Sequence, residues 1–306
     1  MNANLTRKFN IAKKRLFEGP WMKWSISDDD PDNIDGLNLN SPYDVCFYDN
    51  NLVVADTENK QVVILDGKKG ELITTLGKSA ISPVGVAFDR NSNHILVVEA
   101  QRQCILHYDV NTGQCVEGWG KHHFKDARGI GITSNGSVVV SDIELHCIKI
   151  REPGSRKLKR LGSYGTEHHT FRYPMYLNID SNDRILISDT HNNCIKTFDM
   201  SGNILRETRE LRSEKPFGIL SGISTMPNRN IIVCDYLNNF VSMLSNDGHY
   251  IRHLLSSKQS IEQPTGVSIN SSGTDMAVVS AGLYSTLSVY SLDQPTDISK
   301  DIEIVD

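Results

Sequence analysis

The sequence predicts an all-β fold, namely a six-bladed β-propeller whose blades are four-stranded antiparallel sheets. The first observation is a stretch of fifteen residues that recurs six times along the chain without a gap. The second is its spacing, since successive copies begin 43, 43, 47, 46 and 45 residues apart, a period typical of propellers and other repeat folds. The third is that further short apolar segments flank the copies, so that one repeat supplies four strands.

The repeated stretch is clearest in the sequence ILISDTHNNCIKTFD, residues 185–199. Two runs rich in Ile and Val flank a polar loop, which indicates two buried strands joined by a turn. The other copies begin at Leu52, Ile95, Val138, Ile231 and Met276. The third position is always Val or Ile: Val54, Val97, Val140, Ile187, Val233 and Val278.

The fifth position of the stretch is acidic in every copy but the last, where it is Ser280. A carboxylate at the end of a strand can accept backbone N–H bonds from the turn that follows. A ring of carboxylates could also form a metal or catalytic site, but one acid at the same place in each repeat is what a repeated turn requires. We therefore interpret these residues as turn locks: Asp56, Glu99, Asp142, Asp189 and Asp235.

A short, nearly all-apolar strand precedes each copy and is predicted to be the innermost strand of its blade. These strands begin at Pro42, Pro83, Ala127, Pro174, Pro216 and Pro264. Five repeats add a further strand after the copy, over residues 71–77, 115–120, 157–162, 203–209 and 250–255. These last strands carry Lys, Arg and Glu, as is typical of an exposed sheet edge.

The sixth repeat ends without its fourth strand, because a proline follows Tyr290 where that strand should begin. The segment 14–27 can supply the missing strand from the amino-terminal end and close the ring. The segment 301–306 is the competing candidate. We prefer the amino-terminal strand because EGPWMKW resembles VEGWGK of the second repeat.

Three parts of the chain follow from this pattern. Residues 1–40 would hold an amphipathic helix over 2–18 or a frayed leader, then the closing strand and an acidic linker. Residues 41–293 would form the propeller, and residues 294–306 a carboxyl-terminal tail. The chain of 306 residues, 39% of them hydrophobic, is long enough for the large core of one such domain.

Composition and cysteine usage favour a soluble, cytoplasmic protein. No apolar run approaches the ~20 residues that a membrane span needs, and no secretory leader is indicated. The six cysteines are expected to be reduced and buried, since three of them occupy the same position in successive repeats. They are Cys46, Cys104, Cys115, Cys147, Cys194 and Cys234. The net charge of −5 argues against indiscriminate coating of nucleic acid but leaves room for one basic face.

The repeated pattern P-x-G-V/I-A, I-x-V-x-D, x-N-N-x-I is similar to the NHL repeat, and the whole resembles the NHL propeller at the carboxyl end of TRIM-NHL proteins. The fourth repeat matches best, through Pro174, Asp189, Asn192, Asn193 and Ile195. The resemblance implies a domain without catalytic chemistry that binds RNA in some members and protein partners in others. It also implies that RNA binds on the face formed by the loops between second and third strands and by the linkers between blades.

On that face, basic, histidine and aromatic residues are expected to gather. Single-stranded RNA suits such a mixture, because bases stack on aromatic rings, at ~1–3 kcal/mol per base, and phosphates pair with cations. The residue after each innermost-strand proline would line the channel, with Tyr43 and Phe217 either contacting RNA or simply plugging the mouth. The candidate RNA-binding residues are Tyr43, Lys60, Arg102, Lys121, Lys125, Arg128, Arg172, Tyr173, His191, Phe217 and Tyr236.

Neither a metal site nor an active site is expected from the sequence. The histidine pairs at 122–123 and 168–169 lack the spacing of a zinc site, and adjacent residues of a strand point apart. The innermost strands hold no histidine and few polar groups for acid–base chemistry. No nucleophile elbow or phosphate-binding loop is present. We therefore expect a binding domain without cofactor that is not an enzyme.

The main functional hypothesis is recognition of a short single-stranded or stem-loop RNA element, such as one in an mRNA untranslated region, in post-transcriptional regulation. The alternative is a protein-interaction platform, as in substrate recognition by a TRIM-type ubiquitin ligase, which would use the same face or the side walls. The negative net charge and the interspersed acids favour the alternative.

Overall fold

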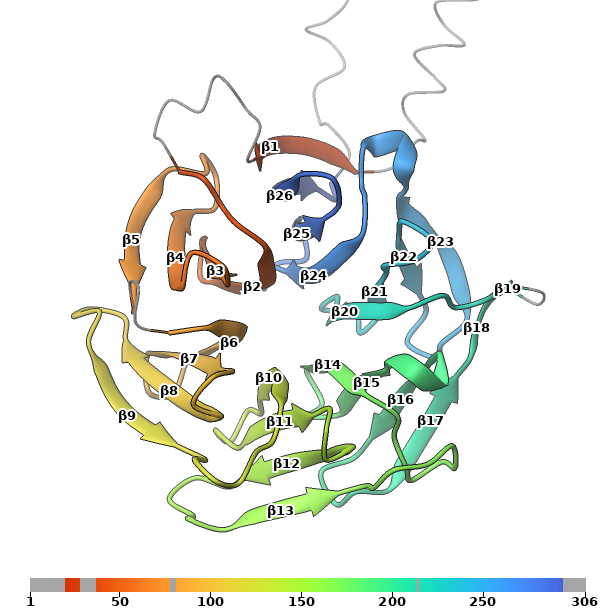
Figure 1. Cartoon of the computed structure of the whole chain (residues 1–306). Helices are drawn as coiled ribbons and strands as arrows, with labels where there is room; N and C mark the ends of the chain where they lie inside the picture. Colours follow the sequence, from red (N-terminus) through yellow and green to blue (C-terminus); the bar gives the residue numbers. More distant parts are fainter. Residues whose placement is uncertain (1–19, 28–36, 78–80, 213–214, 294–306) are drawn as a thin grey trace, which may run out of the picture.

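The computed structural model describes residues 20–27, 37–77, 81–212 and 215–293, and shows an all-β, six-bladed propeller. Six four-stranded antiparallel sheets surround a central axis like the blades of a fan, as predicted (Figure 1). The helix expected over 2–18 and the candidate strand 301–306 lie outside the described residues.

Each of the first three blades runs outward from the axis in chain order. Blade one contains β2 (Pro42–Tyr48), β3 (Asn51–Asp56), β4 (Gln61–Asp66) and β5 (Leu72–Leu76). Blade two contains β6 (Pro83–Asp89), β7 (His94–Glu99), β8 (Cys104–Asp109) and β9 (Cys115–Trp119). Blade three contains β10 (Ala127–Ile132), β11 (Val138–Asp142), β12 (Cys147–Arg151) and β13 (Leu158–Leu161).

The remaining blades add two short helices and one small hairpin. Blade four contains β14 (Pro174–Ile179), β15 (Ile185–Asp189), the 3-10 helix η1 (Thr190–Asn192), β16 (Cys194–Phe198) and β17 (Ile204–Thr208). The hairpin of β18 (Glu210–Arg212) and β19 (Lys215–Pro216) leads to blade five, with β20 (Leu220–Thr225), β21 (Ile231–Asp235), β22 (Phe240–Leu244) and β23 (Tyr250–Leu255). After η2 (Ser257–Gln259), blade six contains β24 (Pro264–Ile269), β25 (Asp275–Ala281) and β26 (Ser285–Ser291).

The amino-terminal strand closes the ring, as the sequence predicted. Strand β1 (Trp21–Ser27) pairs antiparallel with β26 and becomes the outermost strand of blade six. Trp24 also joins this blade to blade one, because its Nε1 donates to the carbonyl oxygen of Gly67 at 3.1 Å. A Cβ on Gly70 would lie 2.9 Å from the same indole ring, so this contact requires a glycine.

The core lies between the blades. Each apolar cluster combines side chains of two neighbouring sheets, as where Val53 and Val62 of blade one meet Val86 and Val97 of blade two. The second strands of all six blades contain unbroken runs of buried residues, because both of their faces pack on a neighbour. This double burial explains why the repeated stretch reads as continuous Ile and Val rather than as an alternation.

Hydroxyl groups fasten neighbouring blades near the axis. Ser188 Oγ donates to the carbonyl oxygen of Ser221 at 2.7 Å, and Ser221 Oγ donates to that of Pro264 at 2.6 Å. Thr265 Oγ1 donates to the carbonyl oxygen of Pro42 at 3.3 Å, which joins the last blade to the first. These buried bonds satisfy carbonyl groups that no strand pairing reaches.

The acidic fifth position locks each blade to the linker before it, which confirms the structural interpretation. Asp189 Oδ1, for example, accepts the backbone N–H of Arg172 at 2.7 Å, and Asp142 Oδ1 accepts that of Leu145 in the following loop at 2.9 Å. The last copy lacks this lock, and the hydroxyl of Ser280 is buried without a hydrogen-bond partner among the described residues. The linker donors are the backbone N–H groups of Asn40, Ser82, Lys125, Arg172 and Gly218.

Blade five differs from the prediction in its register. The residue that pairs with the acidic position is Leu220, opposite Asp235, just as Pro174 pairs with Asp189 in blade four. The innermost strand therefore begins at Leu220 and not at Pro216. Phe217 precedes this strand and is buried, and Ser221 occupies the channel position that the sequence assigned to Phe217.

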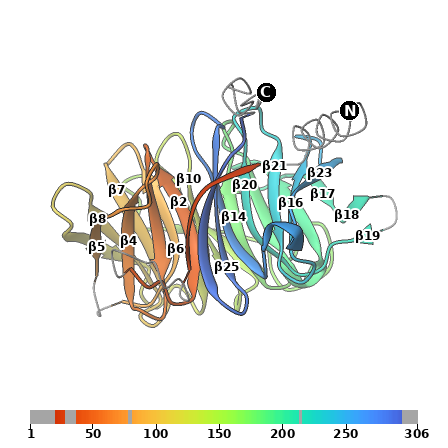
Figure 2. The ribbon, with the colours of Figure 1, turned by 90° about the horizontal axis from the view of Figure 1, so that it is seen from above.

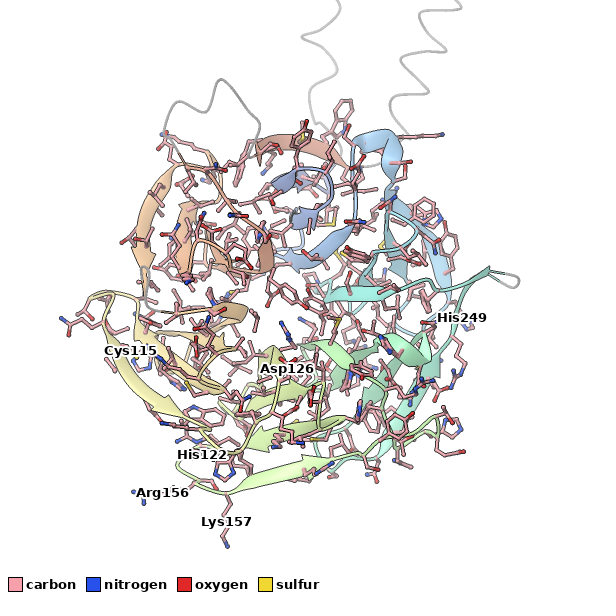
Figure 3. All side chains as sticks on the ribbon, viewed as in Figure 1. Cys115, His122, Asp126, Arg156, Lys157 and His249 are labelled. Carbon is pink, nitrogen blue, oxygen red and sulfur yellow. The ribbon has the colours of Figure 1, made fainter. Side chains whose placement is uncertain are left out.

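All six cysteines are free, and four of them are buried. Contrary to prediction, Cys46 is only half-buried, and Cys115 is exposed because it lies on the outermost strand β9 (Figure 3). Among the described residues, no helix is long and apolar enough to cross a membrane.

Candidate functional site

One flat side of the disc carries both the loops between second and third strands and the linkers between blades. This follows from strand pairing, because Pro42 at the start of β2 lies opposite Asp56 at the end of β3. We call this side the linker face and the opposite side the turn face. Figure 2 shows the disc from its edge, with strands running between the two faces.

The candidate residues of the linker face differ in their accessibility. Tyr43, Arg128, Arg172 and Tyr236 are half-buried, and Phe217 is buried. Lys60 and Arg102 belong to the loops of blades one and two, and the loop of Arg102 contacts the linker of Lys121 and Lys125, where Gln103 Nε2 donates to the carbonyl oxygen of Lys125 at 2.6 Å. The exposed members are Lys60, Arg102, Lys121, Lys125, Tyr173 and His191.

Four rings from three segments form a continuous aromatic row on this face, which we call the aromatic ladder. It consists of Tyr164, His146, Tyr173 and His191, in that order. The ring centroids of His146 lie 4.9 Å from those of both Tyr164 and Tyr173, and Tyr173 lies 4.3 Å from His191. Tyr164 is 63% exposed and Tyr173 is 37% exposed, so that the ladder presents ring surface to solvent.

An unusual backbone conformation places two of these rings. His146 ends the loop before β12 with φ of 50°, and Tyr173 precedes Pro174 with φ of 57°. Both values lie in the left-handed region, which is costly for a bulky side chain. The conformation of His146 belongs to the repeat, because Lys60, Gln103, Asn193 and Asn239 share it at the ends of their own loops. The residues that occupy the position of Tyr173 before other innermost strands, Ser41 and Gln263, share this conformation with smaller or more flexible side chains.

Hydrogen bonds hold the ladder segments to one another. The backbone N–H of Tyr173 donates to Nδ1 of His146 at 3.2 Å, and that of His191 donates to the carbonyl oxygen of Arg172 at 3.0 Å. Burial lowers the pKa of His146, and the neighbouring carboxylates oppose this shift only in part. The ring is therefore neutral at pH 7, as an acceptor at Nδ1 must be.

Guanidinium groups border the ladder. Arg172 lies between two ladder segments, and its Nε is buried without a hydrogen-bond partner among the described residues. Arg160 Nη2 donates to the carbonyl oxygen of Leu145 at 3.0 Å, and Arg209 Nη1 donates to that of Asn192 at 3.2 Å. Glu207 Oε1 lies 2.5 Å from Arg209 Nη2 and offsets its charge, so the positive border that suits an anionic ligand consists of Arg160 and Arg172.

The channel end of the face is packed. The rings of Tyr43 and Tyr176 stack with centroids 5.6 Å apart, and the guanidinium of Arg128 lies 5.5 Å from the centre of the Tyr43 ring. Arg128 Nε also lies 2.9 Å from Asp126 Oδ1, so that a carboxylate offsets its charge. Figure 3 places Asp126 close to the centre of the ring of blades. Tyr43 and Arg128 thus serve first to join blades one, three and four.

A carboxyl group also lines the channel. Asp44 accepts the backbone N–H groups of Val45 at 2.9 Å and of Val86 at 3.0 Å, the second from the next blade. The residue is half-buried, but its carboxyl group lies deep among protein atoms, and this burial raises its pKa to about 7. A carboxyl group with such a pKa can exchange a proton near neutral pH.

The histidine pairs do not form a metal centre. Among the described residues, no group of three or more histidine, cysteine or acidic side chains is placed to hold a metal ion. His168 instead pairs with Glu207, Nδ1 to Oε2 at 2.9 Å, and His169 packs near the ring of Phe198. The linker residues Phe124 and Phe171 are buried and anchor their linkers between blades.

Sequence reasoning missed three residues of this face. His146 was counted only as part of a loop, Tyr164 lies in a linker from which only Arg172 and Tyr173 were selected, and Asp44 was taken as one residue of an apolar strand. A usable signal existed for Asp44, because four of the six equivalent positions are glycine: Gly85, Gly129, Gly222 and Gly266. A Cβ on Gly85 would lie 2.2 Å from the carbonyl oxygen of Arg128 in the next blade, so a carboxylate at this position is exceptional.

No family model matches the chain, and no curated protein matches it. Several solved structures do match the chain. A gluconolactonase from Xanthomonas campestris is 13% identical, with 89% of this chain and 95% of that chain covered and a TM-score of 0.67. A streptogramin B lyase is 11% identical, with 87% and 97% covered and a TM-score of 0.60. An inactive variant of virginiamycin B lyase from Staphylococcus aureus with quinupristin is 15% identical, with 85% and 86% covered and a TM-score of 0.60.

At these identities the similarity shows the propeller fold alone, and it gives no evidence for NHL repeats or for a relation to TRIM proteins. It does contradict the expectation that the chain is not an enzyme, because structural neighbours of the same fold are enzymes. The physical reason lies in the channel. The innermost strands were judged too poor in polar groups, yet Asp44, with a pKa of about 7, lies there beside Tyr43.

Proposed function

We propose that the linker face binds single-stranded RNA, with bases stacked on the aromatic ladder and phosphates near its guanidinium border, and that this binding serves post-transcriptional regulation. The observation that carries the proposal is the ladder itself, an exposed row of rings 4.3 to 4.9 Å apart beside Arg172. Ring faces bind unpaired bases of any sequence, and cations beside them bind the backbone. The resemblance of the repeat pattern to the NHL repeat supports the proposal, since some proteins of that family bind RNA on the corresponding face.

Because of the charges on this face, we propose that only a short stretch of RNA, with few phosphates, contacts it. Asp126 offsets Arg128, Glu207 offsets Arg209, and Glu144 lies beside His146, so carboxylates weaken the positive field of the face even at the ladder. A ligand that needed charge alone would find little advantage here. A ligand with exposed planar groups and a few phosphates gains both stacking and ion pairs.

The test is a fluorescence anisotropy titration of a randomised single-stranded RNA pool with the full chain. Tyr164→Ser and Tyr173→Ser should each weaken binding about 5- to 150-fold, the equivalent of ~1–3 kcal/mol of lost stacking. Arg172→Ala should reduce the slope of log affinity against log salt concentration by about one.

A matched control removes charge from the turn face. Arg156 and Lys157 lie in the turn between β12 and β13, and both are exposed. The variant Arg156→Ala with Lys157→Ala lowers the net positive charge by two without touching the ladder, so it should leave the affinity nearly unchanged. Equal losses in the ladder and control variants would show that any RNA binding is nonspecific charge attraction.

A second candidate function is protein binding, favoured by apolar side chains elsewhere on the same face. Leu237 and Leu283, in the loops of blades five and six, are 61% and 79% exposed, and Ile219 and Tyr284 lie exposed in the same region. Exposed apolar clusters of this kind mark interaction surfaces. Leu237→Ser with Leu283→Ser would abolish capture of a protein partner and leave RNA affinity intact if the two ligands use separate halves of the face.

A further inference from the structure

We infer that His146 is a positioning residue, which holds Tyr173 in its ligand-binding conformation by accepting its backbone N–H on a neutral ring. The part of the inference that concerns ligand binding rests on the proposed function of the ladder. The contact itself is a property of the free protein. It makes the assembly of the ladder dependent on one proton.

The geometry assigns the proton on the imidazole. Nδ1 of His146 lies 3.2 Å from the backbone nitrogen of Tyr173, and a backbone N–H can only donate. Nδ1 is therefore the acceptor, and in a neutral ring the proton lies on Nε2. Any contact that this ring makes with a ligand through Nε2 is a donation, so its ligand partner is an acceptor such as a base carbonyl oxygen or ring nitrogen.

The bond restrains a costly conformation. Tyr173 adopts φ of 57° immediately before a proline, where a bulky residue is disfavoured. The same residue stands between His146 and His191 in the ladder, with ring centroids at 4.9 and 4.3 Å. Loss of the bond to His146 would free Tyr173 to leave the left-handed region, and the row would then be broken at its centre.

The surroundings favour the neutral ring. The charged groups that act on His146 are the carboxylates of Asp142, Glu144 and Asp189, which favour its protonation, and Arg172, which opposes it. The rings of Tyr164 and Tyr173 contact the imidazole and help to bury it. This burial outweighs the effect of the carboxylates, so the pKa of His146 is lowered from 6.5. The ring is thus neutral above pH 6.5 and gains a proton only as the pH falls below that value.

Protonation would place two donors against each other, N–H of Tyr173 and Nδ1–H of His146. The change of RNA affinity with falling pH is therefore opposite to the change that charge attraction alone would cause. Added positive charge on the face would by itself strengthen attraction to phosphate. Protonation of His146 breaks the ladder, so affinity for RNA falls with falling pH.

The variant His146→Asn separates the two effects. Asn193 and Asn239 occupy the equivalent last position of their own loops, with φ of 50° and 58°, so asparagine fits this backbone. Its carbonyl oxygen can accept the N–H of Tyr173, and it does not titrate. The variant loses one ring of the ladder and should bind RNA more weakly than the native protein at pH 7.5, but with an affinity that is constant or rises down to pH 5.5.

The experiment has one readout without ligand and one with it. In the free, isotope-labelled full chain, the amide shift of Tyr173 should titrate with a midpoint below pH 6.5, and in His146→Asn it should not. In RNA titrations by anisotropy, the native affinity should fall from pH 7.5 to 5.5, whereas that of His146→Asn should not.

Two results would overturn the inference: a Tyr173 amide that does not respond to pH in the free protein, or an RNA affinity that falls equally in His146→Asn. A Tyr173 amide that titrates as expected in a chain that binds no RNA at any pH would support the positioning role of His146 and refute the proposed function. The two failures are therefore distinguishable.

Discussion

Replacement of Lys196 by methionine tests how the linker beneath the ladder is held. The Nζ of Lys196 lies 2.9 Å from Asp189 Oδ2 and donates to the carbonyl oxygens of Thr170 at 2.6 Å and Glu167 at 3.0 Å. It also lies 5.4 Å from the centre of the Phe171 ring. The residues Glu167 to Phe171 form the linker between Tyr164 and Tyr173, so one buried ammonium group fastens the segment that carries two ladder rings.

The magnitude follows from complete burial. Both side chains of the Lys196–Asp189 pair have no exposed surface, and removal of one partner of such a pair leaves an uncompensated charge. We expect Lys196→Met to lower the free energy of unfolding by about 3–5 kcal/mol, a large share of the 5–15 kcal/mol typical of a domain. Equilibrium urea unfolding, followed by the fluorescence of the three tryptophans, measures this difference.

Two further variants sharpen the test. Lys149, at the same position of blade three, donates to the carbonyl oxygen of His123 and lies 5.1 Å from the ring of Phe124. Because no ion pair is described for it, Lys149→Met should cost only about 1–2 kcal/mol. Combining Lys196→Met with Asp189→Asn should recover part of the loss. A loss below about 1 kcal/mol in Lys196→Met would refute the argument, since the buried pair would then be dispensable.

Three other predictions concern the axis of the propeller. Burial raises the pKa of Asp44 to about 7, above its unfolded value of 3.8, so the free energy of unfolding should fall as pH rises from about 4 to 7. Urea unfolding at several pH values measures this dependence, and Asp44→Asn should remove it. Thr265→Val breaks the hydrogen bond to Pro42, and its unfolding free energy should drop by about 1 kcal/mol. Gly85→Ala places a Cβ 2.2 Å from the carbonyl oxygen of Arg128, so its melting temperature should drop sharply, and an unchanged value would contradict the packing.

The fold could be predicted from the sequence because it is repeated. The six copies share strands buried on both faces, and burial on both faces forces a continuous apolar run that is visible without coordinates. The closing strand was also predictable, because the sixth repeat lacks its fourth strand. Blade five was misaligned because Pro216 resembles the start of an innermost strand, whereas pairing with Asp235 places that start at Leu220.

The candidate site could be predicted only in part. Arg172, Tyr173 and His191 were selected for their residue types, but the sequence gives no indication that His146 and Tyr164 join them. Their convergence depends on left-handed backbone at two loop ends and on hydrogen bonds between blades three and four. Such conformations depend on tertiary contacts and leave little local pattern in the sequence.

Asp44 shows the same limit in the channel. Its residue type is visible in the sequence, but its raised pKa results from burial among neighbouring blades. The expectation that the chain is not an enzyme counted polar residues along strands, and such a count cannot show how deeply each residue is buried near the axis.

Photo-crosslinking of single-stranded RNA that carries 4-thiouridine, followed by mass spectrometry of the crosslinked peptides, tests the central claim most directly. The account predicts crosslinks in residues 143–146, 163–173 and 190–193, which carry the aromatic ladder, and their loss in the variant with Tyr164→Ser and Tyr173→Ser. Crosslinks confined to the outermost strands or to the turn face around Arg156 and Lys157 would contradict it.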